Sequence, residues 1–132
     1  MRVVIDTNVL VSSFFGGNPR RITDLWKQGR IMLCLSPGIL EEYVEVLERM
    51  GVDRADLEAL LALFAAGPHV LFAASTPSLT VVEKDPDDDK FIECAVALKA
   101  EAIVTGDKAL AAVRSYMGIQ ICAPRQFLGR WT

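Results

Sequence analysis

Histidine and paired cysteines, from which most zinc sites are built, are nearly absent from this sequence. His69 is the only histidine among 132 residues, and Cys34, Cys94 and Cys122 form no C-x-x-C pair. We therefore expect neither a histidine-based zinc site nor a histidine general base. The cysteines are odd in number and lie in apolar neighbourhoods, which predicts buried reduced thiols in a cytoplasmic protein rather than disulfides.

Long apolar runs are missing as well. No stretch approaches the roughly 18 to 20 residues that a membrane helix needs, so we expect no membrane partner. The chain begins directly with a strand-like segment rather than a charged and then apolar leader, so we expect no export signal. The net charge of −3 argues weakly against a nucleic-acid partner, and acids that bind cations would remove that argument.

Apolar residues, by contrast, are abundant and fall into short segments. They make up 52% of the chain, whose length suits one domain over residues 1–132. Apolar runs predict strands over residues 3–5, 31–35, 70–72, 102–105 and 119–122, and a short edge strand over 80–82. Helical spacing predicts helices over 9–15, 19–27, 37–50, 54–66, 86–98 and 108–116, and from 124 onward. This alternation predicts an α/β fold, with a parallel sheet covered by helices on both faces.

Four acids stand at comparable places in this pattern. Asp6 and Asp107 each follow a predicted strand, Glu42 lies in the second turn of a helix, and Asp88 lies in the first turn of another. In a parallel sheet, strand ends and the starts of the following helices share one rim. Carboxylates gathered there repel one another unless a cation lies among them, and oxygen ligands favour Mg²⁺ or Mn²⁺. Such a site suits the hydrolysis of a phosphodiester.

Asp6, Glu42 and Asp88 also have ordinary structural explanations. Asp6 could cap a helix, and Glu42 could belong to a solvated helix face. In the run from Asp85 to Asp89, Asp85 could be an N-cap, and the acids after it could oppose the helix dipole. Gly106 permits an unusual backbone turn that would aim Asp107 at the rim.

The remaining polar candidates could serve in support of the acids. Asn8 and Ser12 lie one turn apart and could orient Asp6 or another ligand, although ordinary capping explains them equally well. A further set of basic residues could hold a phosphate backbone or could be unspecific surface charges: Arg20, Arg21, Lys90 and Lys108.

Four short motifs follow one another along the chain: Asp6-Thr7-Asn8-Val9 after a strand, Ser36 with Glu42 six residues on, Asp88-Asp89-Lys90-Phe91 with Ala95, and Thr105-Gly106-Asp107. In this order and spacing the chain resembles the PIN-domain family. In particular it resembles the toxins of prokaryotic type II toxin–antitoxin systems, which are relatives of the VapC-like ribonucleases. The resemblance covers the whole chain, through Pro124-Arg125-Gln126-Phe127-Leu128.

The resemblance implies a three-layer α/β/α sandwich and a magnesium- or manganese-dependent endoribonuclease that cleaves RNA. It implies Asp6, Glu42, Asp88 and Asp107 as the catalytic and metal-binding acids, with Thr105 as a supporting hydroxyl. Toxins of this kind usually pair with an antitoxin, which implies a homodimer bound by a partner protein. Apolar residues on the first two helices are candidates for the dimer or antitoxin surface, or equally for the core: Phe14, Phe15 and Trp26.

Two other functions are compatible with the pattern. A response-regulator receiver domain also has a strand-end aspartate, which would be phosphorylated. That function expects an acidic pair after the first strand and an acceptor aspartate at a middle strand, whereas residues 33–36 end without an acid. The second alternative is a non-catalytic PIN domain that binds nucleic acid or protein, and the four acids argue against it.

Overall fold

Six strands form one sheet in the computed structural model of the protein, which describes residues 1–131. The last residue of the expected domain, Thr132, lies outside the described residues. The strands are β1 (Arg2–Ile5), β2 (Met32–Leu35), β3 (Val70–Phe72), β4 (Ala102–Val104), β5 (Ser115–Tyr116) and β6 (Ile119–Cys122). Their order across the sheet is β3-β2-β1-β4-β6-β5, and every pairing is parallel except that of β5 with β6.

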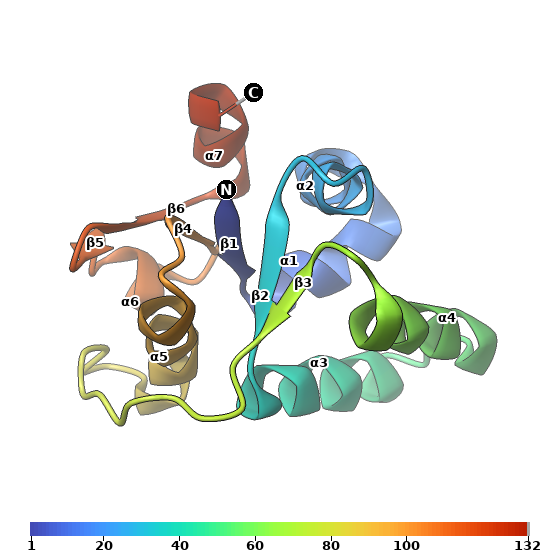
Figure 1. Ribbon diagram of the computed structural model, residues 1–132, viewed down its shortest axis with the longest axis horizontal. Coiled ribbons are helices and arrows are strands. Elements are labelled where there is room, and N and C mark those ends of the chain that lie inside the picture. The colour runs from blue at the N-terminus through green and yellow to red at the C-terminus, as the bar shows by residue number, and fades with distance from the viewer. Residues whose placement is uncertain (132) are drawn as a thin grey trace.

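Helices flank the central strands on both sides. The α-helices are α1 (Thr7–Ser12), α2 (Gly17–Lys27), α3 (Pro37–Arg49), α4 (Arg54–Ala66), α5 (Asp89–Leu98), α6 (Lys108–Ala111) and α7 (Pro124–Trp131). Helices α1 to α4 lie to one side of the central strands and α5 and α6 to the other (Figure 1). The predicted α/β/α sandwich with a mainly parallel sheet is therefore confirmed. In the described part of the chain, none of the helices is sufficiently long and apolar to cross a membrane.

The three central strands are buried on both faces, as their continuous apolar sequences require. Every residue of β4 and all but the first residues of β1 and β2 are buried. Tyr43 on α3 is fully buried and donates its hydroxyl to the carbonyl oxygen of Ile5. This bond fixes α3 beside the end of β1, and with it the helix that carries Glu42.

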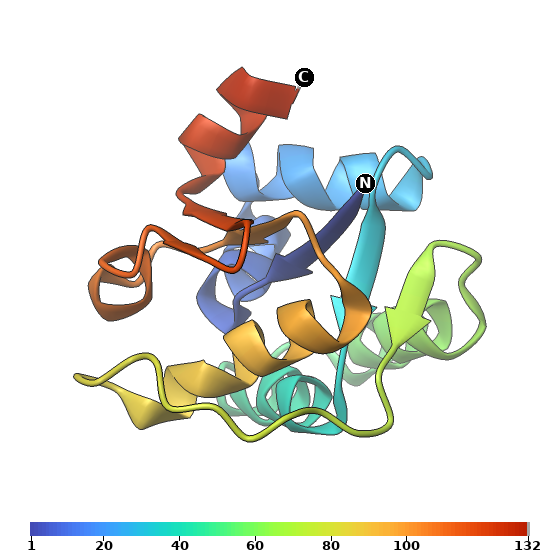
Figure 2. The ribbon, with the colours of Figure 1, turned by 60° about the vertical axis from the view of Figure 1, so that its left-hand side comes forward.

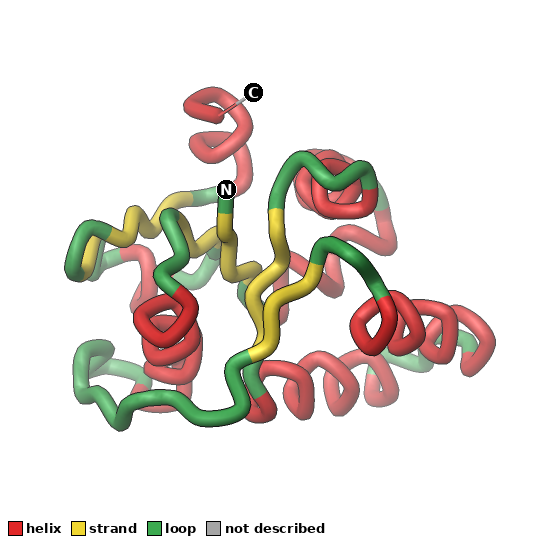
Figure 3. Tube along the Cα trace, in the orientation of Figure 1, coloured by secondary structure: helices red, strands yellow, loops and turns green. Residues whose placement is uncertain are grey.

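One predicted strand is wrong. Residues 80–82 belong to a long loop between β3 and α5, which runs back along α5 in Figure 2 and is drawn as loop in Figure 3. The amides of Val81 and Val82 donate to Asp89 Oδ1 on α5, at 3.0 and 2.8 Å, instead of to a neighbouring strand. A carboxylate thus takes the place of the sheet ladder in satisfying these two amides.

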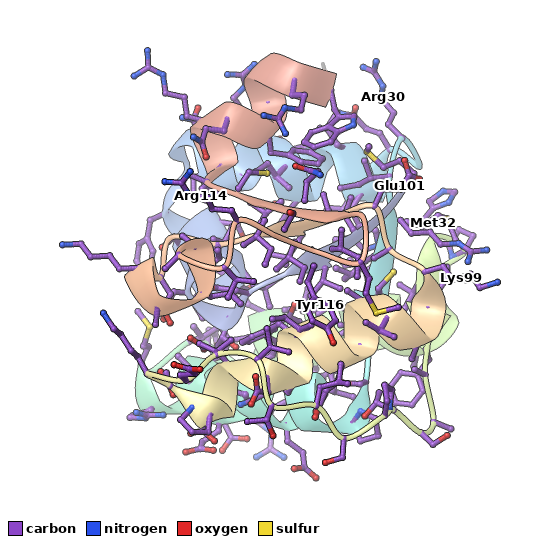
Figure 4. The ribbon with its side chains drawn as sticks, turned by 90° about the vertical axis from the view of Figure 1, so that its left-hand side faces the viewer. Arg30, Met32, Lys99, Glu101, Arg114 and Tyr116 are labelled. Carbon is purple, nitrogen blue, oxygen red and sulfur yellow. The ribbon has the colours of Figure 1, made fainter. Side chains whose placement is uncertain are left out.

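The predicted helix over residues 108–116 is also wrong in its second half. Helix α6 ends at Ala111, and Ser115 and Tyr116 form the antiparallel edge strand β5. Met117 and Gly118 connect β5 to β6 with φ angles of 50° and 83°. Two consecutive residues with positive φ are typical of the tight hairpin turn that matches strand twist. Figure 4 views this edge of the sheet, with Arg114 just before β5 and Tyr116 at its end.

Candidate functional site

The sheet reverses its winding direction between β1 and β4, and the candidate site lies at the ends of these two strands. The chain winds from β1 outward through β2 to β3, and then returns to place β4 on the other side of β1. Ligands of open α/β sheets bind in the crevice that such a switch point leaves at the carboxyl ends of the strands. Ile5 pairs with Val104 at the last position of both strands, so Asp6 and Thr105 emerge side by side.

Asp6 is buried at this point, and both of its carboxylate oxygens have a donor. The amide of Val9 donates to Asp6 Oδ1 at 3.1 Å, so Asp6 is the N-cap of α1. The hydroxyl of Thr105 donates to Asp6 Oδ2. Burial raises the pKa of Asp6, and the hydrogen bond from Thr105 acts in the opposite direction. Asp6 therefore both caps a helix and faces the crevice, which joins the two alternatives that the sequence left open.

Asp88 reaches the crevice from a different segment of the chain. It ends the 3₁₀ turn η2 (Pro86–Asp88), directly before α5. Its side chain is 9% exposed, and within residues 1–131 its Oδ2 atom has no hydrogen-bond partner. Burial, and secondly a hydrogen bond with Asp107, raise the pKa of Asp88 to about 8. A buried carboxylate oxygen that lacks a donor is costly, so this atom indicates a missing positive partner.

Asp107 lies beyond β4, at the start of α6. Its Oδ1 accepts from the amide of Ala109 at 3.0 Å, and its own amide donates to Thr105 Oγ1 at 2.9 Å. The hydrogen bond from Asp88 lowers the pKa of Asp107. The pKa values of these two neighbouring carboxyls are thus shifted in opposite directions, upward for Asp88 and downward for Asp107.

A third carboxylate, that of Asp85, joins these two, although the sequence offered Asp85 only as a possible helix cap. Carboxylate oxygens of Asp85, Asp88 and Asp107 all lie within 4.8 Å of one another. As the residue before η2, Asp85 occupies a capping position, but its side chain makes no capping hydrogen bond. Asp85 therefore holds the N-cap position of η2 without the side-chain hydrogen bond that the capping alternative expects. The i, i+3 spacing of Asp85 and Asp88 is the sequence signal that would have found it.

Glu42 lies on α3 at the edge of this group. Its Oε1 atom forms an ion pair with Lys90 Nζ at 3.0 Å, and its Oε2 accepts the hydroxyl hydrogen of Thr7. Glu42 is therefore not among the three closely grouped carboxylates, although it faces the same pocket. The sequence pointed to Lys90 as a possible phosphate-binding residue, and it gave Thr7 no role beyond its place in the first motif.

The other supporting candidates are divided. Thr105 bonds directly to Asp6, whereas Asn8 is exposed and lines the pocket. Ser12 is exposed and does not contribute to the pocket lining, so the structure does not bring it to the acids. Asp89, the neighbour of Asp88, is buried facing the loop over residues 79–82.

Together these residues surround a pocket of about 180 Å³. Its lining contains six acids and, within the described residues, no basic side chain: Asp6, Glu42, Asp85, Asp87, Asp88 and Asp107, with Thr7, Asn8, Val46 and Phe91. All charged donors are oxygen atoms, which favours a hard divalent cation such as Mg²⁺ or Mn²⁺ over zinc. The unpartnered oxygen of Asp88 supplies an independent reason for a cation there. The predicted metal-binding acids thus line one pocket, although only Asp88 and Asp107 belong to the close group.

Comparison with known families agrees with this geometry. A family model described as PIN domain matches residues 2–109, from β1 to the start of α6. The matched span includes all six acids of the pocket. A comparison with curated proteins finds no match.

Proposed function

The chain belongs to the PIN-domain family, and from that premise we propose that it is a magnesium- or manganese-dependent endoribonuclease that hydrolyses RNA phosphodiester bonds. PIN domains are generally nucleases, and they typically use divalent metals. The observation that carries the proposal for this chain is the buried Asp88 carboxylate oxygen that lacks a donor, in a pocket lined by five further acids.

The charge of the pocket explains why a cation is needed. Six carboxylates would repel the phosphate of an approaching RNA, because like charges within a few ångströms of each other interact strongly at a partly buried site. A divalent cation bound there would offset this charge and would supply water activation and stabilisation of the negative charge on the phosphoryl oxygens and the leaving oxygen. The residues that would hold it are Asp88 and Asp107, with Asp6 and Glu42 on the walls of the same pocket.

The surrounding residues keep these acids in place. Thr105 holds the Asp6 carboxylate through its hydroxyl and accepts the amide hydrogen of Asp107, so one side chain orients two of the acids. Lys90 offsets the charge of Glu42, which lines the same pocket. Loss of such a supporting hydrogen bond typically weakens metal affinity by about 10- to 100-fold. The reaction needs no nucleophile from the protein, since water attacks phosphorus.

Two measurements on the wild type and on Asp88→Asn test the proposal. Calorimetry measures the binding of Mn²⁺, and a second assay measures the cleavage of single-stranded RNA. We expect the wild type to bind Mn²⁺ and to cut RNA in its presence, and Asp88→Asn to lose both properties. Binding of Mn²⁺ without any cleavage would favour the non-catalytic PIN alternative. Absence of Mn²⁺ binding by the wild type would remove the basis of the nuclease proposal.

We propose further that the protein is the toxin of a toxin–antitoxin pair and acts as a homodimer with a cognate antitoxin protein. The support is the resemblance of its four motifs to such toxins. Of the apolar candidates for a partner surface, Phe15 is 75% exposed, Phe14 is half-buried, and Trp26 is in the core. Expression in bacteria should arrest growth for the wild type and not for Asp6→Asn, whereas equal growth of the two would contradict the toxin role.

A further inference from the structure

We infer that Asp85 is a direct ligand of the divalent cation, beside Asp88 and Asp107. This inference rests on the proposed function, because it concerns the metal of that same site. Neither the strand-end pattern nor the helix pattern of the sequence points to Asp85 as a ligand. Its position in the fold, its lack of another role and the state of Asp88 do so together.

The backbone around Asp85 brings its side chain to Asp88. The amide of Asp85 donates to the carbonyl oxygen of Val82 at 3.3 Å. The amide of Asp88 donates to the carbonyl oxygen of Asp85 at 3.0 Å. Pro86 between them restricts the backbone further. Asp85 precedes the 3₁₀ turn η2 and has an extended backbone with a φ of −150° and a ψ of 87°, whereas Asp88 is the last residue of the turn. These backbone contacts hold Asp85 beside the turn, and its carboxylate oxygen lies within 4.8 Å of those of Asp88 and Asp107.

The Asp85 carboxylate has no competing structural role. It makes no capping hydrogen bond to η2 and no ion pair among the described residues, although it is half-buried. In the metal-free protein, the charge of Asp85 adds to the repulsion between the carboxylates of Asp88 and Asp107. A carboxylate that is placed at such cost and stabilises nothing nearby is suited to binding a cation.

Asp88 gives the independent sign of a ligand at this place. Its side chain is nine-tenths buried, and its Oδ2 atom is without a hydrogen-bond partner in residues 1–131. Asp85 and Asp88 line the same pocket. A cation between them would give the Asp88 oxygen the positive partner that the protein's own donors do not provide.

The neighbouring acids differ from Asp85 in their contacts. Asp87 is exposed and lies outside the group of three, although it borders the pocket. Asp89 spends one carboxylate oxygen on two loop amides. Glu42 has its charge offset by Lys90, and its second oxygen holds the Thr7 hydroxyl. Asp85 is thus the acid with the greatest capacity to join Asp88 and Asp107 around one ion.

The test is a calorimetric titration of the full chain with Mn²⁺, comparing wild type, Asp85→Asn and Asp87→Asn. Asp87→Asn is the matched control, because it removes the same charge from the same turn without removing a member of the group. We expect Asp85→Asn to weaken Mn²⁺ binding by about tenfold or more, and Asp87→Asn to change it by no more than about twofold. Circular dichroism checks that the variants are folded, and Asp85→Ser serves the same comparison should Asp85→Asn not fold.

The outcomes separate this inference from the proposed function. If Asp88→Asn loses Mn²⁺ and Asp85→Asn binds it like the wild type, Asp85 is not a ligand and the nuclease proposal is unaffected. If Asp85→Asn and Asp87→Asn weaken binding equally, Asp85 acts only through its charge, and the inference is again overturned. If the wild type binds no Mn²⁺, both the inference and the proposed function fail.

Discussion

Thr105 donates its hydroxyl to the carboxylate of Asp6 across 99 residues of chain, joining the ends of two adjacent strands. The pair is buried, with Asp6 at 3% and Thr105 at 0% exposure. Thr105→Val keeps the shape of the side chain and removes the donor. We expect it to lower the free energy of unfolding by about 1–3 kcal/mol, because a buried charged acceptor loses its partner. Urea unfolding measures the change, and Thr105→Ser, which keeps the hydroxyl, should recover most of it.

Asp6→Asn should keep the fold and abolish RNA cleavage. Asparagine is as good an N-cap as aspartate, so the hydrogen bond from the Val9 amide can persist and α1 should remain intact. The negative charge at the end of β1 is lost, however, and we expect the rate of cleavage to fall by about 100-fold or more. The measurement is the cleavage rate in Mn²⁺ alongside thermal unfolding. Full activity in a folded Asp6→Asn variant would remove Asp6 from the catalytic site.

Glu42 and Lys90 should be coupled energetically, although 48 residues separate them. Their side chains are 29% and 21% exposed, which places the ion pair between a surface pair and a buried one. A double-mutant cycle with Glu42→Gln and Lys90→Gln, followed by urea unfolding of the metal-free protein, should give a coupling of about 0.5–1 kcal/mol. A coupling near zero would show that the pair does not hold Glu42 in place.

Asp88 should make the stability of the metal-free protein depend on pH. Its pKa is raised from 3.8 to about 8 on folding. A carboxyl with a raised pKa holds its proton more tightly in the folded state. Its contribution to stability is therefore fully present below pH 3.8 and is lost as the pH rises through about 8. In the presence of EDTA, we expect the wild type to lose stability over this range relative to Asp88→Asn.

At neutral pH we expect metal-free Asp88→Asn to be more stable than the metal-free wild type. Asp88→Asn removes a buried acid whose Oδ2 atom has no donor, so it should stabilise the metal-free protein by about 1 kcal/mol. Urea unfolding at several pH values measures both effects. A stability difference between the two proteins that does not change with pH would contradict the raised pKa.

Replacement of Asp89, the residue after Asp88, should destabilise the protein, whereas Asp88→Asn should stabilise it. Its carboxylate accepts from the amides of Val81 and Val82, and the first of these bonds is 3.0 Å long. Asp89→Ala leaves both amides without an acceptor and should cost about 1–3 kcal/mol. Hydrogen exchange at these two amides should accelerate as well. A neutral Asp89→Ala would mean that the loop is held by other contacts.

Local pattern was enough to predict most of the elements, because apolar spacing depends only on which side chains face a core. Five of the six predicted strands are present. The exceptions depend on interactions that the pattern does not contain. Val81 and Val82 have the composition of a strand, but Asp89 takes up their amides. The predicted helix over residues 108–116 ends at Ala111, because Arg114 adopts a positive φ angle of 65° and the next two residues pair with β6.

The run of acids at residues 85–89 shows what the sequence determines and what the structure adds. The sequence shows that acids gather there, and the fold decides which of them face the pocket. Composition alone left Asp87, Asp88 and Asp89 as equivalent candidates, and only the family resemblance favoured Asp88. In the fold, Asp88 faces the pocket and Asp89 faces the loop, since adjacent residues of a helix point about 100° apart. Which direction leads to the pocket depends on how α5 packs against the sheet.

The sequence by itself determined that this protein is an α/β sandwich with acids at its strand ends, because strand-end position and apolar spacing are local properties. Only the tertiary structure decided which of those acids meet. Asp85 joins Asp88 and Asp107, while Glu42 is paired with Lys90. These meetings depend on strand order and on helix rotation, which are set by the packing of the whole chain.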